Sequence, residues 1–484
     1  MRSSPLNRRL LFQAAGAAAV AAAVSPFGAA APAAASPGVL YSNALIQQRA
    51  DPFIVRHSDG YYYFTASVPA YDRIVMRRAT TVQGLATAQE VTVWQKHSSG
   101  PMSAHIWAPE LHYISGKWYV YFAAGRADDV WAIRMYALEN ASANPLAGTW
   151  TERGQITTPR DSFSLDATTF TNGSTRYLCW AQSDPELGSG TSLYLAAMAS
   201  PWAITGTPVR ISKPTNSWET IGHNVNEGAA VIKRNGRVFM TFSASATDAN
   251  YAMGLLTASE SANLLSASSW TKSAQPVLRS SDATGQFGPG HNSFTVSEDG
   301  QSDLLVYHAR PYKNISGDPL YDPNRHTRVQ KFYWKADGTP DFGIPVADGA
   351  TPYRLAAHGS TTVFLNHYDF RVRANATPAM LADSQFRIVT GLSGSGTVSL
   401  ESANFPGRFL RHKNYELWVE ANDGTAQFRQ DASFHRRAGL ADAAAVSFES
   451  ANFAGRYLRN ASGLVNLLTV ASDAERAAAT FRLE

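Results

Sequence analysis

The chain contains a single cysteine, Cys179, among 484 residues. One thiol cannot form an intrachain disulfide, so a fold held together by disulfide bridges is excluded. Cys179 lies within Tyr177–Trp180, a short apolar strand, and we expect a small core residue there rather than a nucleophile. The fold must therefore depend on a large apolar core, for which 44% hydrophobic residues are ample.

The chain also lacks a strong excess of charge of one sign. Lys and Arg number 42 against 38 Asp and Glu, and the charges are scattered. No basic run is interleaved with aromatic residues, so we expect no nucleic-acid partner.

The first 35 residues are typical of an export signal rather than of a folded domain. Residues 7–12, NRRLLF, form a twin-arginine pattern, and an Ala-rich apolar stretch leads to an A-x-A cleavage site at Ala33–Ala35. Pro26 and Gly28 interrupt this stretch, so we expect no membrane anchor. Twin-arginine export carries folded proteins, which suits a chain with one cysteine. We therefore expect a secreted bacterial protein.

Five segments of the chain repeat one pattern: a polar residue, a short apolar strand, a Gly or Asn turn and an aromatic strand. The polar residues are Asp51, Glu110, Asp166, Glu227 and His291, whose numbers differ by 59, 56, 61 and 64. This spacing, with many short strands and no long segment of period 3.6, is typical of propeller blades. A β-sandwich would not explain the period. We predict an all-β fold with a five-bladed β-propeller over residues 36–350, in which the five polar residues meet at one mouth of the central channel.

Carboxylates gathered at a channel mouth raise one another's pKa values, and such groups tend to be functional. Two uses fit these residue types. Glycoside hydrolysis needs one protonated and one ionised carboxyl group, and calcium prefers several hard oxygen ligands. Taken singly, Asp51-Pro52 also fits a turn and Glu227-Gly228 a solvated loop end.

Several motifs resemble glycoside hydrolase family 43 between about Asn43 and Asp348. They are RADPFIVR, SLDATTF and NVNEGAAV, around Asp51, Asp166 and Glu227, together with WAPELH, GPGHNSF and YHAR. The resemblance implies that Asp51 is the general base and Glu227 the general acid, while Asp166 orients Glu227 and keeps its pKa high. It also implies inversion, with the two working carboxyl groups roughly 6.5–9.5 Å apart.

The resemblance suggests further residues around the substrate. It places His291 on the channel axis, where it would help to hold a water molecule or, through water, a structural calcium ion; no cofactor is expected to be required. Arg310 would donate to sugar hydroxyls. Trp107 and Trp180 are candidate stacking platforms for sugar rings, with a place in the core as the alternative. Phe287 would form part of the pocket wall.

The sequence changes character from about residue 356. SANFPGRFLRH begins at Ser402, SANFAGRYLRN begins at Ser450, and a weaker copy, FLNH, begins at Phe364. Three repeats of short strands predict a β-trefoil over residues 356–484. They resemble the arabinofuranose-binding module, carbohydrate-binding module family 42; a trefoil without a ligand is the alternative.

In that module, the resemblance implies that a His and an Asp of each repeat form a sugar pocket. The second repeat has both residues, the first has both at a shorter interval, and the third has neither. The corresponding pairs are His412 with Asp431, His367 with Asp383, and Asn460 with Ala478. We therefore expect two working pockets, the one with His412 and Asp431 being the stronger.

Taken together, these patterns and resemblances predict a secreted, inverting, exo-acting α-L-arabinofuranosidase, similar to those of actinobacteria. Its partners would be 1,5-linked arabinan and other arabinose-containing cell-wall polysaccharides, and we expect a monomer. The alternatives are an arabinofuranosidase of arabinoxylan side chains, a β-xylosidase, or a lectin without catalysis. Exo or endo action depends on loops such as Ser67–Arg73, whose conformation the spacing does not reveal.

Overall fold

The computed structural model describes residues 40–376 and 380–484, so the predicted export signal over residues 1–35 lies outside the described part. Within those two ranges, no helix has both the length and the apolar character needed to cross a membrane.

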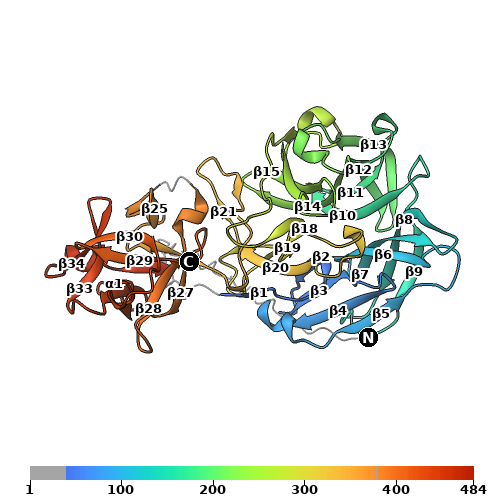
Figure 1. The fold of residues 1–484 in the computed structure, drawn as a ribbon. Helices are drawn as coiled ribbons and strands as arrows, with labels where there is room; N and C mark the ends of the chain where they lie inside the picture. Colours follow the sequence, from blue (N-terminus) through green and yellow to red (C-terminus); the bar gives the residue numbers. More distant parts are fainter. Residues whose placement is uncertain (1–39, 377–379) are drawn as a thin grey trace, which may run out of the picture. The chain divides into compact units, whose positions relative to one another are not determined.

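The first domain consists of five antiparallel sheets arranged around an axis, which confirms the predicted five-bladed propeller (Figure 1). Four blades have four strands and the fifth has three. In chain order the strands are β2 (Ala50–Arg56), β3 (Tyr62–Ser67), β4 (Arg73–Ala79) and β5 (Val91–Gln95); β6 (Ala104–Ile114), β7 (Lys117–Arg126), β8 (Asp129–Asn140) and β9 (Thr151–Gln155); β10 (Ser164–Asn172), β11 (Thr175–Ser183), β12 (Thr191–Ser200) and β13 (Ala203–Ser212); β14 (Asn226–Arg234), β15 (Arg237–Ala244), β16 (Ala252–Ser259) and β17 (Thr271–Lys272); and β18 (Phe287–Val296), β19 (Asp303–Arg310) and β20 (His326–Lys331). A short pair, β1 (Ser42–Asn43) with β23 (Gly349–Ala350), joins the two ends of this segment.

The second strand of each blade explains the aromatic runs in the sequence. Neighbouring blades cover both faces of such a strand, so residues of either parity are buried: all six residues of β3 and eight of the ten in β7 are buried. Each large apolar side chain buried in this way contributes about 1.5–3 kcal/mol. Cys179 is buried on β11, as expected for a core residue.

Each innermost strand carries a β-bulge, and β6 and β18 carry an earlier one as well, at His105 and Gly288. In each blade the bulge nearest the channel mouth begins with a residue of positive φ. These residues are Asp51, Ala108, Asp166, Gly228 and His291, with φ of 53°, 45°, 57°, 55° and 43°. A left-handed conformation costs a residue other than glycine about 1–3 kcal/mol, and inside strands such residues cluster at functional sites. The bulge turns the side chains beside it toward the channel mouth.

The bulges correct the predicted alignment of the blades. Glu110 does not occupy the equivalent position of the second blade, because it lies two residues beyond Ala108 on β6. Glu227 immediately precedes the bulged Gly228. A bulge adds a residue that the alternation of polar and apolar residues does not reveal, so a sequence alignment of strand beginnings is shifted by one or two residues.

The second domain is a single sheet of twelve strands formed by three copies of one unit. Each unit has four strands, and a short helix precedes the fourth. The first unit contains β24 (Tyr353–Ala357), β25 (Phe364–Tyr368), β26 (Arg371–Asn375), η6 (Leu381–Ser384) and β27 (Gln385–Thr390); the second contains β28 (Val398–Ser402), β29 (Arg408–Lys413), β30 (Glu416–Ala421), α1 (Ala426–Asp431) and β31 (Phe434–Ala438); the third contains β32 (Val446–Ser450), β33 (Arg456–Ala461), β34 (Leu464–Thr469), α2 (Asp473–Ala478) and β35 (Phe481–Leu483).

The three units share one core, since equivalent leucines, Leu365, Leu410 and Leu458, are all fully buried in the same cluster. The last strand, β35, pairs with the first, β24, so the sheet closes on itself.

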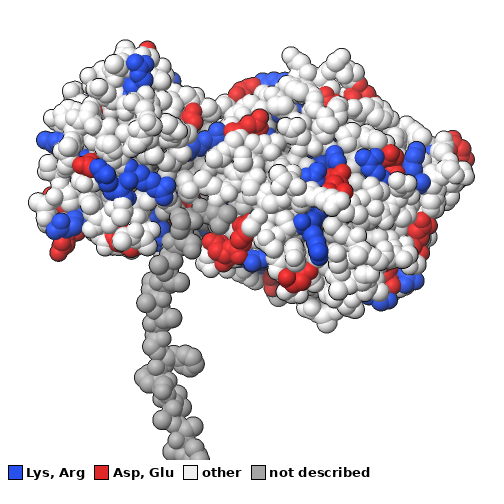
Figure 2. All heavy atoms as spheres, turned by 90° about the horizontal axis from the view of Figure 1, so that it is seen from below, with Lys and Arg blue, Asp and Glu red and all other residues white. Residues whose placement is uncertain are grey.

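On the face of the protein drawn in Figure 2, both signs of charge are present, with short basic clusters rather than a continuous basic surface.

Candidate active site

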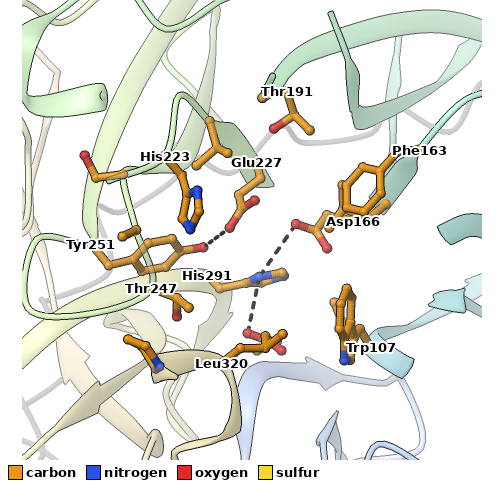
Figure 3. A pocket seen from close by; sticks show the side chains of 18 of the residues that line it. Trp107, Phe163, Asp166, Thr191, His223, Glu227, Thr247, Tyr251, His291 and Leu320 are labelled. Atoms are coloured by element: carbon orange, nitrogen blue, oxygen red, sulfur yellow. Dashed lines mark hydrogen bonds and ion pairs between the residues drawn. The ribbon is translucent and has the colours of Figure 1, made fainter. Parts of the chain in front are cut away.

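A pocket of about 680 Å³ opens at the mouth of the propeller channel. Every blade contributes to its lining through its innermost strand: Asp51, Trp107, Asp166, Glu227 and His291. The structure therefore brings the three predicted carboxylates and the predicted histidine together. Figure 3 shows Glu227, Asp166 and His291 between a wall with Trp107 and an opposite wall with Tyr251.

Asp51 lies among hydrogen-bond donors and positive charge. Ser67 Oγ donates to its Oδ2 at 2.6 Å, and Arg325 Nη1 lies 3.3 Å from its Oδ1. Burial alone would raise the pKa of Asp51, but the positive charges of Arg325 and His291 hold it well below the usual range. Asp51 is therefore ionised at any pH near neutrality, which is the state a general base needs.

In contrast to Asp51, Asp166 and Glu227 have raised pKa values. Burial raises the pKa of Asp166 to about 6, although His291 opposes the shift. Burial raises the pKa of Glu227 to about 7; the negative charge of Asp166 adds to this, and a hydrogen bond of 2.8 Å from Tyr251 Oη to Oε1 opposes it. The backbone N–H of Gly228 donates to Asp166 Oδ2 at 3.0 Å and fixes that carboxylate beside Glu227. Glu227 can therefore remain protonated near neutral pH while Asp51 is ionised.

His291 stands between two carboxylates. Its Nδ1 lies 3.4 Å from Asp51 Oδ1 and 3.9 Å from Asp166 Oδ2, and its backbone N–H donates to Ser243 Oγ at 2.8 Å. Burial lowers the pKa of His291, but the surrounding carboxylates outweigh burial, so the pKa is raised. When protonated, His291 reduces the repulsion between Asp51 and Asp166.

Metal binding at His291 stays a prediction. Across residues 40–376 and 380–484, no group of three or more His, Cys, Asp and Glu side chains is arranged to hold a metal ion. Calcium takes six to eight oxygen ligands, and an imidazole nitrogen is a poor donor for it.

Two of the aromatic residues predicted to contact substrate do not line the pocket. Trp180 is fully buried on β11, where its Nε1 donates to Gln182 Oε1 at 3.0 Å. Phe287 is also buried, and the Lys313 ammonium lies over its ring. Trp180 therefore takes the place in the core that the sequence left as its alternative, and the expectation that Phe287 forms part of the pocket wall is corrected. Trp107 does line the pocket.

The expectation that Arg310 donates to sugar hydroxyls is also corrected. Its side chain is fully buried and lies outside the pocket lining. Its Nη1 donates to Thr247 O at 2.7 Å, its Nη2 to Pro319 O at 2.6 Å, and its Nε to Asp322 Oδ1 at 3.3 Å. All three guanidinium nitrogens therefore hold the protein's own loops, and Arg310 does not reach a sugar.

Several residues of the site were not predicted. They are the neighbours of the carboxylates and further aromatic lining: Ser67, Tyr251, His308, Arg325, Trp131 and Phe163. His308 is typical of them. Burial lowers its pKa to about 3, so its neutral Nδ1 accepts the backbone N–H of Asp51 at 3.1 Å. YHAR, which contains His308, is one of the motifs that carry the family resemblance, but no spacing in the sequence signals the contact of His308 with Asp51.

The second domain brings both predicted His–Asp pairs together. His412 Nε2 lies 3.3 Å from Asp431 Oδ1, and His367 Nε2 lies 3.5 Å from Asp383 Oδ1. An asparagine from the following unit, not predicted, bridges each pair. Asn452 Nδ2 donates to Asp431 at 2.8 Å, and Asn404 Nδ2 donates to Asp383 at 2.7 Å. In the third unit, Asn460 accepts a hydrogen bond from the backbone N–H of Gly463, and Ala478 ends α2 where Asp431 ends α1.

Comparison with known families agrees with this geometry. Residues 41–340 match the family described as glycosyl hydrolases family 43, and residues 353–483 match the alpha-L-arabinofuranosidase B (ABFB) domain. The chain belongs to glycosyl hydrolase family 43. It is a glycoside hydrolase with an ABFB domain at its C-terminal end.

Similar proteins cover most of the chain. An extracellular exo-alpha-(1->5)-L-arabinofuranosidase of Streptomyces avermitilis is 63% identical over 397 residues, which are 82% of each chain. Alpha-L-arabinofuranosidase 43 of Humicola insolens is 57% identical over 399 residues, 81% of this chain and 83% of that protein. The crystal structure of an alpha-L-arabinofuranosidase from Lactobacillus brevis, 56% identical, superposes with a TM-score of 0.62 over 64% of this chain and 98% of that one.

Proposed function

We propose that the protein is an extracellular, inverting, exo-acting α-L-arabinofuranosidase that releases terminal arabinofuranose from 1,5-linked arabinan. The observation that carries this proposal is the pairing, in one pocket, of an ionised Asp51 with a protonated Glu227. The names of the similar proteins in Streptomyces avermitilis and Humicola insolens support the sugar and the linkage.

The reaction uses these two carboxyl groups in one displacement. Asp51 accepts a proton from a water molecule as the water oxygen forms a bond to the anomeric carbon. The bond from that carbon to the leaving oxygen breaks, and Glu227 delivers its proton to this oxygen. Asp166, held by the N–H of Gly228, keeps Glu227 protonated until the proton is needed.

The second domain would hold the enzyme on its polysaccharide. We assign it as a β-trefoil that begins with β24 (Tyr353–Ala357), three residues before the expected residue 356, and follows a catalytic domain over residues 36–350. Three copies of one unit and a shared core support the trefoil. Two arabinofuranose pockets would use His412 with Asp431 and His367 with Asp383, both at hydrogen-bonding positions.

Export and assembly complete the proposal. Residues 1–35 would direct twin-arginine export, and the mature chain would act as a monomer. Cleavage after Ala35 in the secreted protein and light scattering of the purified enzyme test these two statements.

The product profile on defined polysaccharides tests the main proposal. Arabinose should be the product from debranched 1,5-arabinan. Faster release of arabinose from arabinoxylan would indicate a side-chain arabinofuranosidase, and release of xylose from aryl xylosides would indicate a β-xylosidase. Binding to arabinan without hydrolysis would indicate a lectin.

A further inference from the structure

The strand that carries the general acid begins with a buried asparagine. Asn226 is the first residue of β14, directly before Glu227, and it is fully buried. Successive side chains of a strand point to opposite faces, so Asn226 points away from the pocket that Glu227 lines. Within the described part of the chain, the Glu227 carboxyl group accepts one hydrogen bond, from Tyr251 (Figure 3). The position of the acid therefore depends mainly on where its backbone is held.

Every hydrogen-bonding position of the Asn226 amide is used. Its Oδ1 accepts from Ser212 Oγ at 2.6 Å and from Lys272 Nζ at 3.3 Å. Its Nδ2 donates to Glu219 Oε1 at 3.2 Å and to Val225 O at 3.0 Å. An amide oxygen has two acceptor sites and an amide nitrogen has two hydrogens, so these bonds fix the side chain in one orientation.

A buried ion pair stands behind this asparagine. Glu219, fully buried at the end of η3 (Ser217–Glu219), accepts from Lys272 Nζ at 2.8 Å. Its other oxygen accepts the backbone N–H groups of the two residues that precede η3, at 2.7 and 2.6 Å. An interior ion pair is costly to desolvate and often adds no stability over apolar packing. Both charged groups here contact Asn226, so the pair defines the place of its amide.

The network joins the third blade to the fourth. Ser212 ends β13 and Thr191 begins β12, whereas Lys272 belongs to β17. Thr191 Oγ1 also donates to the backbone oxygen of Asn226 at 3.3 Å. These two blades carry the orienting carboxylate and the general acid. Because a misplacement of about 1 Å can slow a reaction about a hundredfold, bonds across this boundary bear directly on the rate.

We propose that Asn226 is a positioning residue of the reaction, which the Glu219–Lys272 pair and Ser212 hold in place so that Glu227 reaches the leaving oxygen. The inference rests on the proposed function, because it takes Glu227 as the general acid. Asn226 does not line the pocket, and it acts on Glu227 through the backbone that the two residues share.

The test compares 1,5-linked arabinotriose, whose leaving group needs a proton, with a nitrophenyl α-L-arabinofuranoside, whose leaving group hardly does. Asn226→Ala removes the whole amide, and Ser212→Ala removes one of its bonds. Asn140→Ala is the matched control. Asn140 is also buried, donates to Ala147 O and accepts the backbone N–H of Ser142, both at 2.8 Å, and lies outside the pocket lining.

Asn226→Ala should lower kcat/KM about a hundredfold on arabinotriose but less than about tenfold on the nitrophenyl glycoside. Ser212→Ala should show the same preference on a smaller scale, and Asn140→Ala should show none. An unfolded fraction lowers both rates by the same factor, so the ratio of the two losses reports the position of the acid and not the amount of folded enzyme.

Equal losses on the two substrates in Asn226→Ala and Ser212→Ala would overturn the inference. Failure of both variants to fold would also overturn it, because the network would then hold the blade rather than the acid. Glu227→Gln, which lacks the acid, separates this inference from the proposed function. If Glu227→Gln itself lost activity equally on both substrates, the proposed role of Glu227 would be wrong.

Discussion

Replacing Tyr251 by phenylalanine should move the alkaline limit of activity to higher pH. The Tyr251 hydroxyl donates to Glu227 Oε1 at 2.8 Å, and this bond favours the ionised carboxylate. A hydrogen bond to a charged group contributes about 1.5–3 kcal/mol, and one pKa unit corresponds to about 1.4 kcal/mol. Its loss should therefore raise the pKa of Glu227 from about 7 by about one to two units.

The direction in which the alkaline limit of activity moves follows from the role of Glu227 as the general acid. The enzyme is active while Glu227 is protonated, so a higher pKa extends activity to higher pH. The assay is kcat/KM against pH on an arabino-oligosaccharide, since this profile reports the pKa values of the free enzyme. Tyr119→Phe is the control, because Tyr119 makes a bond of the same length, 2.8 Å, to Glu139 outside the pocket. An alkaline limb that stays in place, or moves to lower pH, would refute the assignment of Glu227 as the acid.

Three further predictions follow from the site and the second domain. Asp51→Asn and Glu227→Gln should each lower kcat by about 10²–10⁴-fold on arabinan, but an aryl glycoside with a good leaving group should partly rescue only Glu227→Gln; equal losses would contradict the two roles. Asp431→Ala should weaken retention of the whole protein on insoluble arabinan more than Asp383→Ala does, because Arg411 also donates to Asp431; unchanged retention would count against the pockets. Exhaustive chelation should change activity modestly, and a strict metal requirement would show that the carboxylates are metal ligands.

The architecture could be predicted because burial leaves a direct record in the sequence. The second strand of each blade is covered on both faces, and β3 and β7 therefore appear as aromatic runs at regular intervals. The three units of the second domain were visible for a similar reason, since each supplies equivalent residues to one core. The aligned positions of Asp431 and Ala478, each ending a short helix, agree with the sequence comparison.

Positions within the blades were predicted less well. Glu110 was aligned with Asp51, but the bulge puts Ala108 at the equivalent place and leaves Glu110 farther along the strand. Bulges form where backbone pairing changes register, and no residue type announces them. For the same reason, the sequence does not show which tryptophan faces the pocket. Trp107 lies beside a bulge and faces it, whereas Trp180 is packed between blades.

The direction of a charged side chain was also hidden. Arg310 and Arg325 flank one loop, and either could have reached the site. Main-chain oxygens of the loop accept Arg310, whereas Arg325 contacts Asp51. Which of the two arginines reaches the active site depends on the conformation of the loop between them. Asn404 and Asn452 were missed for another reason: each completes a pair that belongs to the preceding unit.

The configuration of the first product tests the central claim most directly. If Asp51 activates water on the face opposite the bond that Glu227 protonates, hydrolysis of an α-linked arabinofuranoside must release β-arabinose first. Proton NMR spectra taken within the first turnovers, before mutarotation, distinguish the two anomers. Initial accumulation of the β-anomer is the predicted result. Initial accumulation of the α-anomer would mean that a carboxylate attacks the sugar itself, and would contradict the roles assigned to Asp51 and Glu227.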